Sequence, residues 1–213
     1  MRTHALAMFA AAAATAASAG NAGAVLVELT ANGMVTSIDG GLLAPFDTLT
    51  VGDEWQITAR YETDTPPVPG QVTATTALYS SAVTEISVLI DGIEAVHPGT
   101  EGDSFLSVQN DFDSAGPDRD GFSIARDVND RKILLGMMDF DQTALDSIEP
   151  PSAFDFSEFD EALFALETGE FPDEARLEGS VANVTLRIIP APAATTALLL
   201  TPALVACRRR RQS

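Results

Sequence analysis

The stretch DEWQITARY, Asp53 to Tyr61, alternates apolar and polar side chains with a period of two. One face carries Trp55, Ile57, Ala59 and Tyr61, and the positions between them are polar. This pattern is typical of a β-strand that buries one face and exposes the other to water. The pattern predicts that Trp55 and Tyr61 are core residues rather than parts of an exposed aromatic surface.

Similar patterns recur on both sides of this stretch. In EISVLIDGIEAV, residues 85–96, Asp91-Gly92 separates two apolar runs and predicts a type I′ hairpin. KILLGMMDF, residues 132–140, is apolar on both faces and predicts a central strand. Asn32-Gly33 is either a hairpin turn or a bulge in one long strand. Further strands are expected near residues 25–31, 34–38, 76–83, 105–109, 122–126 and 176–188.

Only one segment of the body has helical spacing. In SEFDEALFALET, Ser157 to Thr168, the side chains of Phe159, Ala162 and Leu166 fall on one helical face. Many short strands with turn-rich links predict an all-β fold, a two-sheet antiparallel β-sandwich with one short helix. A jelly-roll topology is one option for this sandwich.

The N-terminus has the order of a secretory signal peptide. A short positive region is followed by an Ala-rich apolar run, with small-residue cleavage boxes ending at Ala19 and Ala24. Residues 1–24 are therefore predicted to be a signal peptide that signal peptidase removes, and residues 25–188 a single domain.

The C-terminal segment, residues 189–213, has three parts. A box reading Pro190-Ala191-Pro192 precedes an uncharged stretch, residues 193–207, and a basic cluster follows it, formed by Arg208, Arg209, Arg210 and Arg211. The stretch is shorter than the roughly 20 residues that span a bilayer, so it predicts at least transient membrane anchoring with the arginines in the cytoplasm.

This layout resembles the PEP-CTERM sorting signal. The resemblance implies recognition and removal of the tail by an exosortase-type enzyme during delivery to the envelope or exopolysaccharide matrix. The central residue of the box is alanine here, where the family usually has glutamate. An ordinary tail anchor is the alternative. The stretches VGDEWQITARYETDTP and LEGSVANVTL also resemble, more loosely, an uncharacterised β-rich domain that accompanies such tails.

The charge of the body excludes some partners. All 31 acidic residues but only seven of the twelve basic ones lie in residues 25–189, so the net charge there is 7 − 31 = −24. Nucleic acids and anionic lipids are held by positive charge, so we expect neither as a partner of the body. Cys207, in the tail, is the only cysteine, which leaves the body without disulfides.

Few residues in the body suit catalysis. His97 is its only histidine, and the sequence has no nucleophile elbow, Walker loop or dinucleotide fingerprint. With 31 acids, some carboxylate pair will have glycosidase spacing by chance. We therefore predict no enzymatic activity and no obligatory cofactor.

The loop NDFDSAGPDRDGF, residues 110–122, offers weak candidates for Ca²⁺ ligands, namely Asp111, Asp113, Asp118 and Asp120. The alternative is a solvated acidic hairpin loop. The sequence thus predicts an exported protein of the cell envelope, cell surface or extracellular matrix with a structural or interaction role. A polysaccharide-binding module, assisted by calcium, is the alternative function.

Overall fold

The computed structural model describes residues 25–96, 102–112, 118–128, 131–169 and 174–190. Within them the chain forms strands and two short 3₁₀ turns, η1 (Phe46–Thr48) and η2 (Phe156–Glu158). The strands are β1 (Leu26–Asp39), β2 (Glu54–Glu62), β3 (Thr76–Tyr79), β4 (Val83–Ile90), β5 (Ile93–Val96), β6 (Asp103–Phe112), β7 (Arg119–Val128), β8 (Arg131–Asp139), β9 (Glu161–Thr168) and β10 (Ala175–Ile189).

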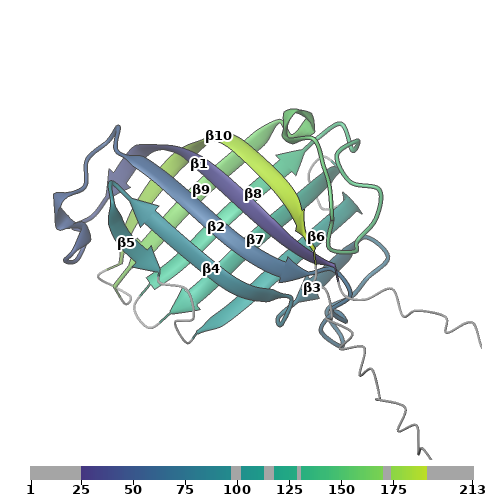
Figure 1. Ribbon diagram of the computed structural model, residues 1–213. Coiled ribbons are helices and arrows are strands. Elements are labelled where there is room, and N and C mark those ends of the chain that lie inside the picture. Colours follow the sequence, from purple (N-terminus) through teal and green to yellow (C-terminus); the bar gives the residue numbers. More distant parts are fainter. Residues whose placement is uncertain (1–24, 97–101, 113–117, 129–130, 170–173, 191–213) are drawn as a thin grey trace, which may run out of the picture.

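These strands form one antiparallel sheet in the order β3-β6-β7-β8-β9-β10-β1-β2-β4-β5 (Figure 1). The all-β prediction is confirmed, and β8 is a central strand as expected. The prediction of two separate sheets is wrong for the described residues. Period-two alternation shows that one face of a strand is buried, but it does not show whether a second sheet or the same sheet covers that face.

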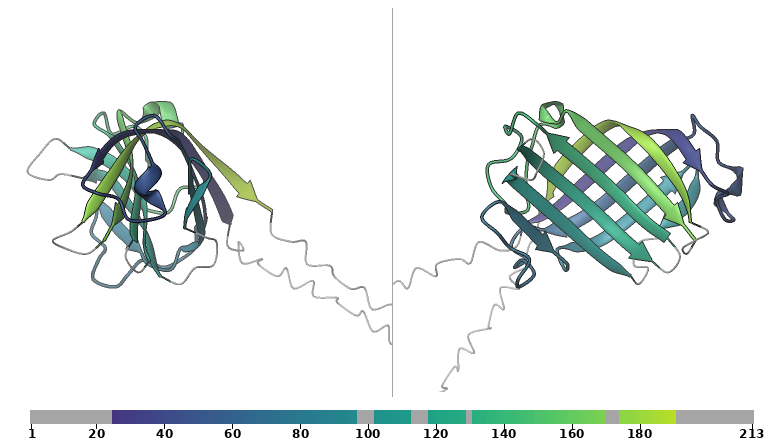
Figure 2. Two further views of the ribbon diagram at one scale, coloured as in Figure 1. Left: turned by 90° about the vertical axis from the view of Figure 1, so that its left-hand side faces the viewer. Right: turned by 180° about the vertical axis from the view of Figure 1, so that it is seen from behind.

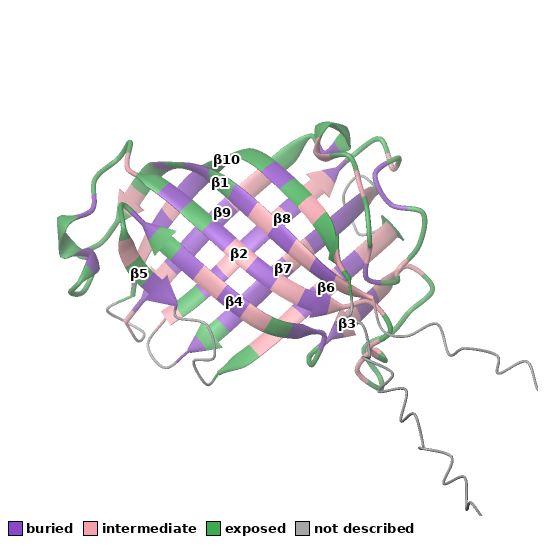
Figure 3. Cartoon of the chain, viewed as in Figure 1, coloured by how far each residue is buried: buried purple, intermediate pink, exposed green. Residues whose placement is uncertain are grey.

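The sheet rolls up around its own interior, as the end-on view in Figure 2 shows. Its two edge regions meet where the Ser104 hydroxyl on β6 donates a hydrogen bond to the Val83 carbonyl on β4. The buried side chains therefore come from inward-facing positions around the whole roll, which gives the striped burial in Figure 3. The largest fully buried ones include Trp55, Tyr61, Phe122 and Phe164, so the prediction that Trp55 and Tyr61 are core residues is confirmed.

The first and last strands are neighbours in the sheet. Leu26 of β1 pairs with Ile189 of β10, and the pairing continues to Asp39 and Arg176. Asn32-Gly33 is not a hairpin turn, because it continues one long strand. The register shift there comes from the partner strand: Asn32 pairs with Asn183 and Gly33 with Val181, so the bulge lies at Ala182 of β10. We call the end of the roll that holds Leu26 and Ile189 the terminal end, and the opposite end the distal end.

Loop segments close both ends of the roll. At the distal end, the loop between β1 and β2 buries Leu42, Phe46 and Leu49. At the terminal end, the segment between β8 and β9, residues 140–160, buries Ala144, Leu145 and Phe159. The Asp91-Gly92 hairpin has positive φ at both positions, 47° and 76°, as a type I′ turn requires.

The predicted helix over residues 157–168 is wrong. Only η2 is helical, and β9 follows it, pairing with β8 and with β10. Phe164, Leu166 and Thr168 alternate inward, and Leu163 and Ala165 face outward. This strand carries apolar residues on both faces, so its sequence also fits the spacing of a helix. Its hydrogen-bonded pairing with β8 on one side and β10 on the other makes it a strand. The predicted terminal helices lie outside the described residues.

Candidate functional site on the outer wall

One region of the outer wall carries no charged side chain. It covers the middle of five adjacent strands, β3, β6, β7, β8 and β9, which face the viewer in the right-hand view of Figure 2. The register places its members side by side. We call it the uncharged face; it consists of Thr76, Leu78, Phe105, Ser107, Gln109, Gly121, Ser123, Ala125, Leu134, Gly136, Met138, Leu163 and Ala165.

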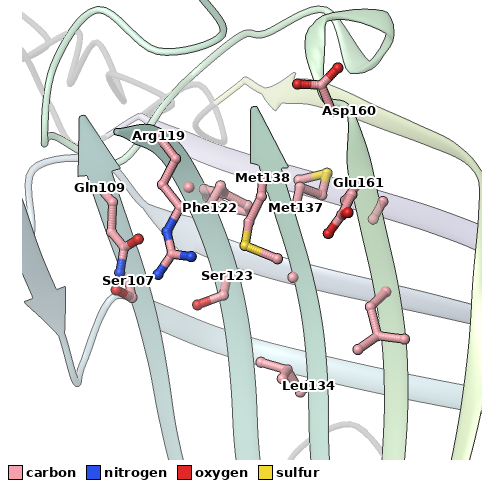
Figure 4. Close-up of a pocket in the computed structure, with 14 residues that line it drawn as sticks. Ser107, Gln109, Arg119, Phe122, Ser123, Leu134, Met137, Met138, Asp160 and Glu161 are labelled. Carbon is pink, nitrogen blue, oxygen red and sulfur yellow. The ribbon is translucent and has the colours of Figure 1, made fainter. Parts of the chain in front are cut away.

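Small residues hollow this face. Gly121, Ser123 and Gly136 lie at its centre, and Leu134, Met138 and other larger side chains stand around them (Figure 4). The resulting groove has a volume of about 630 Å³, and the charged side chains of Arg119, Asp160 and Glu161 line it from the terminal end (Figure 4). A Cβ atom on Gly136 would meet no other atom within 4 Å, so the hollow there is open to a partner.

Two cations lie at the rim of the uncharged face. Arg119, at the terminal end of β7, lies over the ring of Phe112 at 5.8 Å. Neither Arg119 nor Lys132, at the distal end of β8, forms a salt bridge with any residue in the described part of the chain. The exposed carboxylates of Asp127 and Glu161 lie at the same two rims.

The part of the wall that β10, β1 and β2 form is different, because its arginines are paired. Glu28 on β1 binds Arg60 of β2 and Arg187 of β10, and Arg60 also binds Glu85 of β4. The hydrogen bond from Arg60 is the main cause that lowers the pKa of Glu28. A second group joins Arg176 to Glu167 and Glu178. Arg119 and Lys132, beside the uncharged face, could therefore form ion pairs with a partner without breaking one among the described residues.

The three candidate calcium ligands that the structure describes, Asp111, Asp118 and Asp120, do not form a metal-binding group. Asp113 lies outside the described residues, Asp118 is exposed, and Asp120 is fully buried. The Asp120 carboxylate accepts hydrogen bonds from the backbone N–H groups of Asp111 and Leu145. In the described part of the chain no three acidic or histidine side chains are placed to hold a metal ion.

Asp120 and Asp139 instead fasten the segment that closes the terminal end. Asp139 accepts hydrogen bonds from the backbone N–H groups of Asp141, Thr143 and Ala144, and from the Thr143 hydroxyl. Burial is the largest single influence on the pKa of Asp139 and acts to raise it, but these hydrogen bonds together lower it below the ordinary value of 3.8. Sequence reasoning missed Asp139, and took Asp120 for a surface ligand.

The remaining predicted site residues lie at the ends of the chain. Pro190 is exposed and directly follows β10. Ala19, Ala24, Ala191, Pro192 and the four terminal arginines lie outside the described residues, as does His97. Across the parts of the chain that are described, no helix is both long and apolar enough to cross a membrane.

Sequence reasoning did not find the uncharged face. Its members come from five strands between residues 76 and 165, and only the pairing register brings them together. The one available signal was KILLGMMDF, where apolar residues occupy both faces of a strand. Comparisons of the chain with family models, curated proteins and solved structures find no match.

Proposed function

We propose that this protein is exported to the cell envelope or extracellular matrix, where its body has a structural or interaction role. The two terminal segments supply the delivery. Signal peptidase acts after Ala19 or Ala24, and a sorting enzyme of the exosortase type acts near Pro190, Ala191 and Pro192. The arginine cluster holds the tail at the membrane until that step.

The observation that carries this proposal is the pairing of Leu26 with Ile189. The first and last strands of the body therefore end side by side, which is where the proposed signal peptide and the proposed sorting segment would join it. A tail held in a membrane would therefore attach the body at its terminal end only. The outer wall and the distal end would stay accessible to other molecules.

A contact role suits the rest of the body. Large inward side chains fill the interior, and loops close both ends of the roll. The outer wall is therefore available to a partner, and the uncharged face is the part of it that we propose for the contact. Its side chains are partly exposed or covered by their neighbours, and contiguous patches of apolar and small residues on an otherwise charged surface typically mark interaction sites.

Intact-mass measurement on the native host tests the proposed delivery. Envelope, membrane and medium fractions are collected separately, from cells that carry either the wild-type chain or a variant with Arg208, Arg209, Arg210 and Arg211 changed to serine. We expect a wild-type species that begins after Ala19 or Ala24 and ends near the Pro190 box, outside the inner membrane.

The variant serves as the matched control. Without its basic cluster, the tail should not stop in the membrane, and we expect an unprocessed chain in the medium. A full-length wild-type C-terminus found only in membranes would make the segment a permanent anchor and overturn the sorting step.

A further inference from the structure

The charge pattern along β7 is self-complementary. Its outward residues read Arg119, Gly121, Ser123, Ala125 and Asp127. A cation stands four positions before Ser123, an anion stands four positions after it, and small residues fill the space between. A copy of this strand laid antiparallel over the first, face to face, would bring each Arg119 opposite an Asp127.

We propose that the uncharged face binds a second copy of this chain, forming a two-fold symmetric dimer centred on Ser123. This inference rests on the proposed contact role of the same face and names its partner. The two-fold axis lies in the interface and runs across the strands, so the terminal end of one copy lies over the distal end of the other. Such an isologous contact makes every pair twice.

Charge supports a second copy as the occupant. Arg119 forms no ion pair with a residue in the described parts of its own chain, whereas the outward arginines on the opposite wall are all paired. In the dimer its guanidinium would meet Asp127 of the partner. Asp103 lies beside Asp127 in the register and adds a second carboxylate near the incoming arginine.

The size of the face predicts the strength of the dimer. Five strands about 4.8 Å apart and the eight residue steps from Arg119 to Asp127, rims included, enclose on the order of 600 Å² per copy, and the convex wall lets two copies bury less than this. Stable complexes bury about 800 Å² per partner. The dimer should therefore be weak and depend on concentration.

Salt gives this dimer a distinctive behaviour. The bodies carry −24 each and repel one another at long range, and salt screens that repulsion. The two rim ion pairs are exposed and are each worth about 1 kcal/mol or less, so weakening them matters less. Association should therefore strengthen between about 0.05 and 0.5 M NaCl, over which the Debye length falls severalfold.

Sedimentation velocity of the full chain, over a range of concentrations and at both salt levels, is the first test. Ser123→Glu places two carboxylates at the centre of the interface, and we expect it to abolish the dimer. The matched control is Thr58→Glu, on the outward face of β2 in the opposite wall, which should dimerise like the wild type. Unchanged fluorescence from the buried Trp55 checks the fold of both variants.

Two further variants test the symmetry. Arg119→Asp and Asp127→Arg should each weaken the dimer by about tenfold, and the double variant should restore it because the charges are only exchanged. In a Cys207→Ser background, Ser123→Cys lies on the two-fold axis and should be joined to its counterpart by a short bismaleimide crosslinker, because sheets packed face to face lie about 10 Å apart, which is too far for a disulfide. Thr58→Cys should stay monomeric.

Three outcomes would overturn the proposal. A monomer at all concentrations and both salt levels means that the face binds no second copy. Association that survives Ser123→Glu runs through another part of the chain. A complex that forms only when host polysaccharide is added would assign the face to sugar instead. None of these results affects the intact-mass test, so failure of the dimer and failure of the proposed delivery are separable.

Discussion

Trp55 reaches its position in the core because two glycines on neighbouring strands leave room for the indole ring. It stacks on Phe164 with ring centroids 4.2 Å apart, and its Nε1 donates a hydrogen bond to the Ser180 carbonyl. A Cβ atom on Gly179 would lie 2.4 Å from that Nε1, and one on Gly33 would lie 1.8 Å from the Ser180 oxygen. The position of the tryptophan therefore depends on the absence of a side chain at both glycines.

We expect Gly179→Ala to destabilise the protein by about 1–3 kcal/mol, because the indole must move within a packed core. Urea unfolding followed by Trp55 fluorescence measures the change. Gly136→Ala is the matched control, since a Cβ there meets nothing within 4 Å, and it should change stability by less than about 1 kcal/mol. Equal effects of the two substitutions would show that the indole does not limit the space at Gly179.

The Asp139 carboxylate predicts a loss of stability in acid. Because its pKa is lowered in the folded protein, its contribution is fully present above the ordinary value of 3.8 and is lost as the pH falls through the lower folded pKa. Asp139→Asn should remove this part of the pH dependence and cost about 1–3 kcal/mol at neutral pH, because backbone donors lose their acceptor. Thermal unfolding of both proteins between about pH 2 and pH 7 tests this; parallel curves would contradict it.

At the scale of elements, the segment 140–160 is held in place over the terminal end of the roll by hydrogen bonds and packing. Tyr61 donates a hydrogen bond from its hydroxyl to the Pro151 carbonyl at 2.6 Å, and Tyr79 donates one to the Ile148 carbonyl at 2.8 Å. Burial raises the pKa of the Tyr61 hydroxyl, so it stays protonated and remains a donor. Phe154 and Phe159, which pack edge to face at 5.2 Å, hold the later part of the segment.

We expect Tyr61→Phe to loosen this segment at a cost of about 1 kcal/mol, the net worth of one buried hydrogen bond. Hydrogen exchange should speed up at amides near Pro151 and stay unchanged in β1. Tyr79→Phe should act in the same way near Ile148. Faster exchange throughout the sheet would instead mean that the hydroxyl supports the core as a whole.

Most strands could be predicted from their period-two alternation, and the Asp91-Gly92 hairpin could be predicted from its turn chemistry. β9 could not, because its outward Leu163 and Ala165 belong to the uncharged face and hide the alternation. The closure of the terminal end could not be predicted either. It depends on Asp120 and Asp139, which are buried. The sequence around them is rich in acidic residues, and nothing in it distinguishes a buried aspartate from an exposed one.

At the scale of the whole molecule, sequence reasoning gave the all-β class but not the way the sheet closes. The alternation indicates which residues point inward, but a rolled sheet and a pair of facing sheets produce the same alternation. The same limit hid the uncharged face, since its contiguity depends on register between strands far apart in the chain. Composition did give the charge of the body, which is a whole-molecule property in its own right.

That charge predicts a protein stabilised by salt. With a net charge of −24 on residues 25–189, self-repulsion opposes the compact state, and salt screens it. We expect the melting temperature to rise between about 0.02 and 0.5 M NaCl, where the Debye length shrinks from about 20 Å to a few Å. The same rise in Ser123→Glu would separate this effect from dimerisation, and a flat or falling melting temperature would contradict the prediction.

The adjacency of β1 and β10 affects how an exported chain could fold. The two strands lie near the middle of the sheet. On one side of them are β2, β4 and β5, and on the other are β9, β8, β7 and β6. Only β10 joins these two halves in the sheet, so they stay separate until β10 has emerged. A translocating chain delivers β1 first and β10 last. If the chain is exported as proposed, the roll would be completed only after nearly the whole body had crossed the membrane, and a tail that pauses there would give β10 time to pair with β1 and β9.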